Sequence, residues 1–173
     1  MLLNKKIQVA LVFIMTMVVF CVSAVSANTV MVYVHEAGPA YDDDVTRDYL
    51  EGVEDGLMDM LFETGVIAFS VGGIHNSAEY EAAPRYFAVE AAERGGAQML
   101  IDVGISTIGT RDGGNGLSFE QGVLRVRNIP EGQVLRELSL QPKEQAVTRG
   151  EPGYRSGAQL GREAAGTIVS LFE

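Results

Sequence analysis

The order of short apolar runs and helical segments is the feature that most constrains the fold of this chain. Three apolar runs, at residues 29–35, 66–71 and 98–105, have the length and composition of buried strands. Amphipathic segments separate them. Because strands joined through a helix pair in parallel, with the helix packed on a face of the sheet, this order predicts two successive strand–helix–strand units.

The first expected helix begins in the acidic run at residues 42–44 and ends near Gly65. Its apolar stripe repeats every four residues, at Val45, Tyr49, Val53, Leu57 and Leu61. Gly52 and Gly56 lie one turn apart on the same helix, where each glycine costs about 1 kcal/mol relative to alanine. The pair therefore predicts that another backbone packs closely against this helix.

The two later helices are marked by residues that favour helix ends. Pro84 suits the first turn of a helix that Gly95 and Gly96 would terminate. Ser156 and Gln159 have the spacing of a capping box for the last helix. That helix would bury a stripe formed by Leu160, Ala164, Ile168 and Leu171.

After the third strand the pattern changes from strand–helix to strand–strand. Residues 112–116 form a polar, glycine-rich loop, and an extended segment at 117–128 follows without a helix. Residues 129–132 have the proline and glycine positions of a type I turn, and 133–140 returns as the partner strand of a hairpin. The chain is therefore predicted to be a single α/β domain, residues 28–173, with the order β-α-β-α-β-β-β-α.

The right-handedness of crossover connections restricts how these strands are arranged. Because the first and second strands are apolar on both faces, we expect the second and third strands to flank the first, with the connecting helices on opposite faces. The hairpin would then continue the sheet antiparallel beyond the third strand. The last helix should pack on the same face as the helix from Asp44. The result would be a mixed sheet with helices on both faces.

The amino-terminal segment, residues 1–27, has the three parts of a signal peptide. Lys5 and Lys6 precede a nearly unbroken apolar stretch, and small residues end at Ala27, after which we expect cleavage. Ala24 offers a second site with the same spacing. The prediction is an exported, periplasmic protein.

Two alternatives for this segment stay open. The apolar stretch approaches the length of a membrane span, about 17–20 residues, so it could be retained as an anchor. Cys21 could carry a lipid, although Phe20 occupies a position where the cleaving enzyme requires a small residue. Contact with the membrane is expected only if the segment is retained or Cys21 is lipidated.

Composition excludes several classes of function. Removal of residues 1–27 from the 173 would leave 146 residues without cysteine, and 11 basic against 23 acidic groups, a net charge of −12. Such a charge repels nucleic acid, so no nucleic-acid partner is expected. One cysteine and two histidines exclude a multi-cysteine zinc site, an iron–sulfur cluster and a disulfide framework.

The two histidines are candidates for chemistry. His35 ends the first strand and His75 follows the second, so both could lie at the carboxyl edge of the sheet, where open α/β folds bind ligands. With the acidic run at residues 42–44 they could form a metal site or an acid–base pair. Alternatively, the carboxylates cap the helix and the histidines are exposed loop side chains. The spacing does not force them together.

Asp102 interrupts the third strand, where a carboxylate needs hydrogen bonds. It is either a perturbed acid or a group satisfied by a loop amide. The loop at Gly113 and Gly114 lacks the following helix that a phosphate site requires, and no Gly-x-Ser-x-Gly motif is present. We therefore predict no catalytic, cofactor-binding or metal-binding residue.

Two segments carry a resemblance to known families. They are Ala-Ala-Glu-Arg-Gly-Gly-Ala-Gln-Met-Leu-Ile-Asp-Val-Gly at 91–104 and Val-Leu-Arg-Val-Arg-Asn-Ile-Pro-Glu-Gly-Gln-Val-Leu-Arg-Glu at 123–137. With the order of elements, they resemble the amino-terminal domain of TolB, the curli-secretion CsgG family and the LpoB-type activators of penicillin-binding proteins. The resemblance implies a bacterial envelope protein that binds other proteins without catalysis.

We therefore expect an exported, non-enzymatic adaptor or assembly domain of the cell envelope, with another envelope protein as its partner. The alternative is a periplasmic small-ligand or metal-binding protein, or an enzyme, that uses the sheet edge near His35 and His75. Residues 133–140 would form a terminal strand open to a partner strand, or an edge guarded by Arg136 and Glu137.

Overall fold

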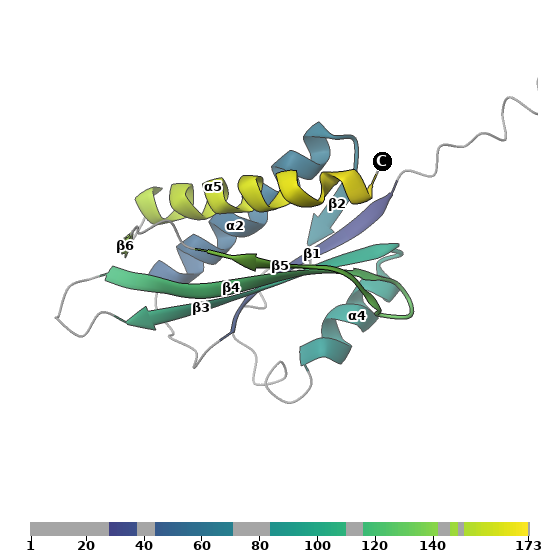
Figure 1. Cartoon of the computed structure of the whole chain (residues 1–173), viewed down its shortest axis with the longest axis horizontal. Coiled ribbons are helices and arrows are strands. Elements are labelled where there is room, and N and C mark those ends of the chain that lie inside the picture. Colours follow the sequence, from purple (N-terminus) through teal and green to yellow (C-terminus); the bar gives the residue numbers. More distant parts are fainter. Residues whose placement is uncertain are drawn as a thin grey trace, which may run out of the picture.

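A mixed β-sheet lies between helices on both of its faces in the computed structural model (Figure 1). The structure describes residues 28–37, 44–70, 84–109, 116–141, 146–148 and 151–172. The elements are β1 (Thr29–Glu36), α2 (Asp44–Glu63), β2 (Ile67–Ser70), α4 (Pro84–Arg94), β3 (Met99–Gly109), β4 (Gly116–Asn128), β5 (Val134–Leu140), β6 (Ala146–Thr148), α5 (Glu151–Ile168) and the 3-10 turn η1 (Val169–Leu171).

The sheet has the strand order β2-β1-β3-β4-β5, and the short β6 pairs with β4. β1 is parallel to both β2 and β3, whereas β3, β4 and β5 are successively antiparallel. The second and third strands therefore flank the first, and the hairpin continues the sheet beyond β3. Both expectations are confirmed.

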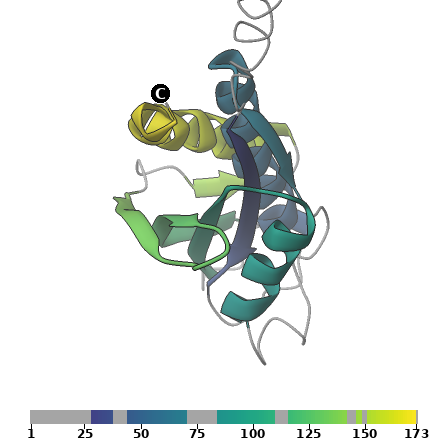
Figure 2. The same cartoon turned by 90° about the vertical axis from the view of Figure 1, so that its right-hand side faces the viewer.

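Alternate residues of β1 face opposite layers of helices. Val30, Val32 and Val34 belong to the larger core, beneath α2 and α5, whereas Met31 and Tyr33 belong to the smaller core beside α4. Figure 2 shows α4 on one side of the sheet and α5 on the other. The predicted placement of the last helix on the same face as the helix from Asp44 is confirmed.

The packing of α2 against α5 depends on glycines in both helices. A Cβ atom on Gly52 or Gly56 would overlap the carbonyl oxygen of Tyr154 or Ala158. Conversely, a Cβ atom on Gly157 of α5 would overlap the carbonyl oxygen of Tyr49 on α2. The close approach that the glycine pair predicts is confirmed, and the approaching backbone is that of α5.

The start of α5 differs from the prediction. The helix begins at Glu151, so Ser156 lies inside it and the expected capping box is wrong. Pro152 falls in the first turn, where its missing N–H is tolerated, and Gly157 packs against α2. Residues that favour a loop in isolation therefore belong to this helix. β6 was also missed, because three residues are too few to show a strand pattern.

The turn of the hairpin is wider than expected. The Gly132 N–H donates to the Asn128 carbonyl over 2.9 Å, one residue beyond the acceptor of a type I turn. Gly132 has a φ of +67°, which glycine adopts without strain, and the Ile129–Pro130 peptide bond is cis. The expected type I turn is therefore wrong, although the hairpin itself is present.

Several positions singled out in the sequence lie outside the described residues. They are residues 1–27, which include the expected leader, and Gly113 and Gly114 in the loop before β4. Within the described part of the chain, no helix is both long enough and apolar enough to span a membrane.

Candidate functional site

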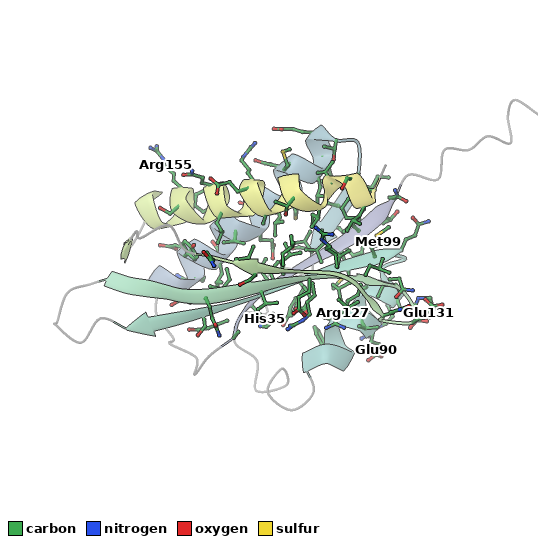
Figure 3. The ribbon with its side chains drawn as sticks, in the orientation of Figure 1. His35, Glu90, Met99, Arg127, Glu131 and Arg155 are labelled. Carbon is green, nitrogen blue, oxygen red and sulfur yellow. The ribbon has the colours of Figure 1, made fainter. Side chains whose placement is uncertain are left out.

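Three ionisable side chains form a row across β1, β3 and β4 on the face of the sheet that α4 partly covers. The Nε2 atom of His35 lies 3.1 Å from Oδ1 of Asp102, and Oδ2 of Asp102 lies 3.7 Å from Nη2 of Arg127. These side chains are 12%, 13% and 12% exposed, respectively. Figure 3 shows His35 and Arg127 beneath the sheet, on the side of α4. We call these three residues the charged row.

The strand register produces the charged row. Asp102 pairs with Tyr33 across β1 and β3, so His35, two residues further along β1, lies diagonally from Asp102 on the same face. Gly104 lies opposite His35, and a Cβ there would come within 3.0 Å of the imidazole Cε1. Glycine at this position leaves room for the ring. Arg127 reaches Asp102 diagonally from β4.

The surroundings of His35 favour a hydrogen-bonded structural role for its ring over the role of a reactive base. Nδ1 lies 3.2 Å from the Glu36 carbonyl oxygen while Nε2 faces Asp102, so both ring nitrogens have an acceptor beside them. A general base or a metal ligand needs a ring nitrogen with an available lone pair. The ring also stacks on Tyr33, with centroids 5.4 Å apart.

Tyr33 shows how strongly this face excludes water. Burial, followed by the negative charge of Asp102, raises the pKa of the Tyr33 phenol above its ordinary value. The phenol therefore stays neutral throughout the physiological range.

The structure tests part of the predicted chemistry. His35 is not an exposed loop side chain, and Asp102 is satisfied by side chains instead of a loop amide. His75 and residues 42–43 lie outside the described residues. Among the residues that are described, no group of three or more His, Cys, Asp or Glu side chains could hold a metal ion. Arg127 was not predicted as part of this site. Along β4 it alternates with apolar residues, and this alternation places it on the same face as Asp102.

A second candidate site is the outer edge of β5. β5 ends the strand order, and no other strand among the described residues pairs with its outer side. Four successive residues, 134–137, are exposed, so both faces of the strand are open there. Val134 is 39% and Leu135 48% exposed. In Figure 2 the green hairpin of β4 and β5 forms one margin of the sheet, beyond the helices.

The charges on β5 are unequally compensated. Glu137 accepts a hydrogen bond from Arg125 of β4, with 2.7 Å between Oε2 and Nε. Arg136 pairs with the buried Val126, so it lies on the other face of the sheet, toward α2 and α5. Within the described residues, Arg136 has neither an ion pair nor a hydrogen bond from its side chain.

A bulge divides the strand. Val126 pairs with Arg136 and Arg127 with Val134, so Leu135 is an extra residue on β5. From Arg136 to Leu140 the register is regular, and Leu138 packs partly on the larger core. The regular, five-residue stretch 136–140 is called the open edge below.

No family model matches the chain, and no curated protein matches it.

Solved structures are similar in their arrangement. The PelC dodecamer from Paraburkholderia phytofirmans is 11% identical over 84% of this chain and 87% of that chain, with a TM-score of 0.48. Lipoprotein GNA1162 from Neisseria meningitidis is 14% identical over 83% and 96%, with a TM-score of 0.47. The LpoB C-terminal domain from Salmonella enterica is 13% identical over 71% and 84%, with a TM-score of 0.31. LpoB is among the families that the sequence resembles, but similarity at this level does not assign the chain to a family.

Proposed function

We propose that this chain is an exported protein of the bacterial cell envelope that binds another protein through the edge of β5 and acts without catalysis. The signal-peptide features of residues 1–27 support export. The resemblance of residues 91–104 and 123–137 to envelope families supports the compartment and the binding role. The observation that carries the proposal is the terminal strand β5, exposed on both faces from Val134 to Glu137.

Strand addition is the mode of binding that this edge allows. A terminal strand presents unpaired backbone N–H and C=O groups, which an extended segment of another protein can pair with. Val134 and Leu135 add exposed apolar surface beside these groups. Covering them would remove apolar area from water, which favours association.

The competing interpretation is that β5 is protected against edge-to-edge aggregation and that no partner binds to it. Arg136, Glu137 and the bulge at Leu135 are devices that natural sheets use against aggregation. A guarded edge, however, gains nothing from two exposed apolar side chains next to its charges. Binding explains both the apolar residues and the charges, because charges also select the partner.

The alternative function near His35 and His75 has less support. Both ring nitrogens of His35 face acceptors, so a ligand or substrate would first have to break an existing contact. A small molecule or a metal that raised the melting temperature, with no protein partner recovered, would favour this alternative.

The test is crosslinking and recovery of the protein from its own envelope fraction, with proline placed in the open edge. Because N–H groups alternate sides along a strand, only one of Glu137→Pro and Leu138→Pro removes a donor of the β4 ladder. Thermal unfolding identifies the variant that keeps the fold. That variant should lose a specific crosslinked partner that the wild-type protein retains.

A second variant covers the case in which both proline variants unfold. Leu135→Lys removes exposed apolar surface without touching the core and should also weaken the crosslink. Retention of the same partner by every folded variant would contradict binding at β5.

A further inference from the structure

We infer that the strand added at β5 belongs to a different protein, not to a second copy of this chain, and that it places an acidic side chain opposite Arg136. This inference rests on the proposed function. The expected partner is an extended segment that carries an acidic residue and an apolar residue two positions apart, on the same face of the strand.

The local charge of the open edge favours an acidic partner. The chain carries a net charge of −10, yet the charge at the open edge that lacks compensation is positive. Glu137 is neutralised by Arg125 at 2.7 Å, whereas Arg136 has no charged partner among the described residues. A partner strand would bring Arg136 next to a new set of side chains. An acidic residue directly opposite would form a cross-strand ion pair there.

A second copy that pairs its β5 antiparallel with this one does not supply the acidic side chain, because of the symmetry of such a pair. When two β5 strands pair antiparallel, the two-fold axis that relates the copies is perpendicular to the sheet. Such an axis leaves every residue on its own face, and residues directly opposite one another share a face. Arg136 could then face only Arg136, Leu138 or Leu140 of the copy. Glu137 lies on the other face and could never be opposite Arg136.

The other edge of the sheet does not change this result. β2 has the sequence Ile-Ala-Phe-Ser at residues 67–70, without an acidic residue. Head-to-tail pairing of β5 with β2 of a copy would therefore also leave Arg136 uncompensated. Among the strands that the structure describes, neither β5 paired antiparallel nor β2 of a copy places a carboxylate opposite Arg136, so we assign the missing carboxylate to a strand from another protein.

The register of the open edge gives the pattern of the partner. On the face of Arg136, the next residue is Leu138, which packs partly on the larger core and favours an apolar side chain opposite. On the other face Glu137 is already paired, and Ser139 is small and exposed. The partner strand should therefore carry an acidic and an apolar residue two positions apart.

The experiment is a peptide-display selection against the purified protein, expressed with its own leader. The library consists of nine-residue segments in which threonine alternates with a randomised position. Wild-type protein should enrich Asp or Glu at one position, with an apolar residue two positions away. Arg136→Glu should enrich Lys or Arg at that position.

The matched control is Arg155→Glu, which makes the same change of charge on α5. Figure 3 shows Arg155 on the outer side of that helix, away from the sheet. This variant should keep the acidic preference. For the best selected peptide, the dissociation constant should rise about tenfold or more in Arg136→Glu and less than about twofold in the control, because an attractive cross-strand pair becomes a repulsive one.

The outcomes separate the two proposals. Enriched segments without an acidic preference, or a preference that survives Arg136→Glu, would overturn the inference and leave strand binding intact. A wild-type protein that enriches no segment, or segments that bind the folded proline variant equally well, would overturn the proposed function itself. Sedimentation of the wild-type protein as a dimer that the proline variant abolishes would identify a second copy as the occupant and overturn the inference.

Discussion

Asp102 on β3 accepts a hydrogen bond from His35 on β1, with 3.1 Å between Oδ1 and Nε2, although the two residues are 67 positions apart in the chain. The other carboxylate oxygen lies 3.7 Å from Nη2 of Arg127 on β4. One carboxylate therefore connects side chains from three neighbouring strands on the face of α4. The consequence is a structural role for Asp102 that can be measured.

Replacing Asp102 by asparagine should lower the free energy of unfolding by about 2 kcal/mol. The change leaves the largely buried guanidinium of Arg127 without its nearest carboxylate. Chemical denaturation measures the loss. Glu90→Gln on α4 is the control, because its exposed pair with Arg94 should contribute less than about 0.5 kcal/mol. Equal effects in the two variants would show that the charged row adds nothing to stability.

Gly56→Ala and Gly166→Ala should change stability in opposite directions. Alanine at position 56 would overlap the backbone of Ala158 and force α2 and α5 apart, with an expected loss of about 2 kcal/mol or more. Nothing lies within 4 Å of a Cβ at position 166, so the usual helix preference for alanine should stabilise that variant by about 0.5–1 kcal/mol. Thermal melts of both variants test this. A stabilised Gly56→Ala protein would mean that the helices do not pack as described.

Leu57→Ala and Ile168→Ala should each lower the free energy of unfolding by about 2–5 kcal/mol. Both side chains are completely buried, on α2 and α5 respectively, in the larger core. Phe62→Ala is the control, since its side chain is 52% exposed. Denaturant titration is the measurement. Losses below about 1 kcal/mol at both buried positions would mean that the buried helical faces are wrongly assigned.

Stability should fall as the pH rises from 10 to 12. Burial raises the pKa of Tyr49 from 10.0 to about 12, and a hydrogen bond to Asp55 is the main cause that raises the pKa of Tyr154 to about 12. A raised pKa means that the folded state holds the phenolic proton more tightly. The contribution is complete below pH 10 and disappears through pH 12. Tyrosinate absorbance and the unfolding midpoint should change together in this interval.

Tyr49→Phe provides the comparison for this pH dependence. It keeps the buried ring and removes the ionising group, so its stability should fall less steeply between pH 10 and 12. An identical decline in wild type and Tyr49→Phe would show that Tyr49 does not titrate in this interval.

Processing of the amino terminus should yield a species that begins at Asn28 or Val25. Cleavage after either small residue at Ala27 or Ala24 produces these ends. Intact-mass measurement of the protein from the envelope fraction checks this. Full-length protein in the membrane would instead identify an anchor, and an acyl mass on Cys21 would identify a lipoprotein.

Local signals predicted most of the elements. Pro84 and Gly95 bracket α4 as expected, because a first-turn proline and a terminal glycine act through their own backbone geometry. The flanking of β1 by β2 and β3 followed from apolar residues on both faces and from the right-handed crossover. Gly52 and Gly56 indicated that another backbone packs closely against α2, but they did not indicate that this backbone belongs to α5.

The sequence by itself determined the order of the elements apart from β6 and most of the faces that they bury, because hydrophobic periodicity and end signals are local. Leu171, expected in the buried stripe of the last helix, is instead 37% exposed. Only the tertiary structure decided where α5 starts, since Gly157, six residues into the helix, is accounted for by the backbone of α2 packed against it. It also decided the charged row of His35, Asp102 and Arg127. Those contacts depend on the register between strands, and register is set by how whole strands pair and pack, not by any short segment.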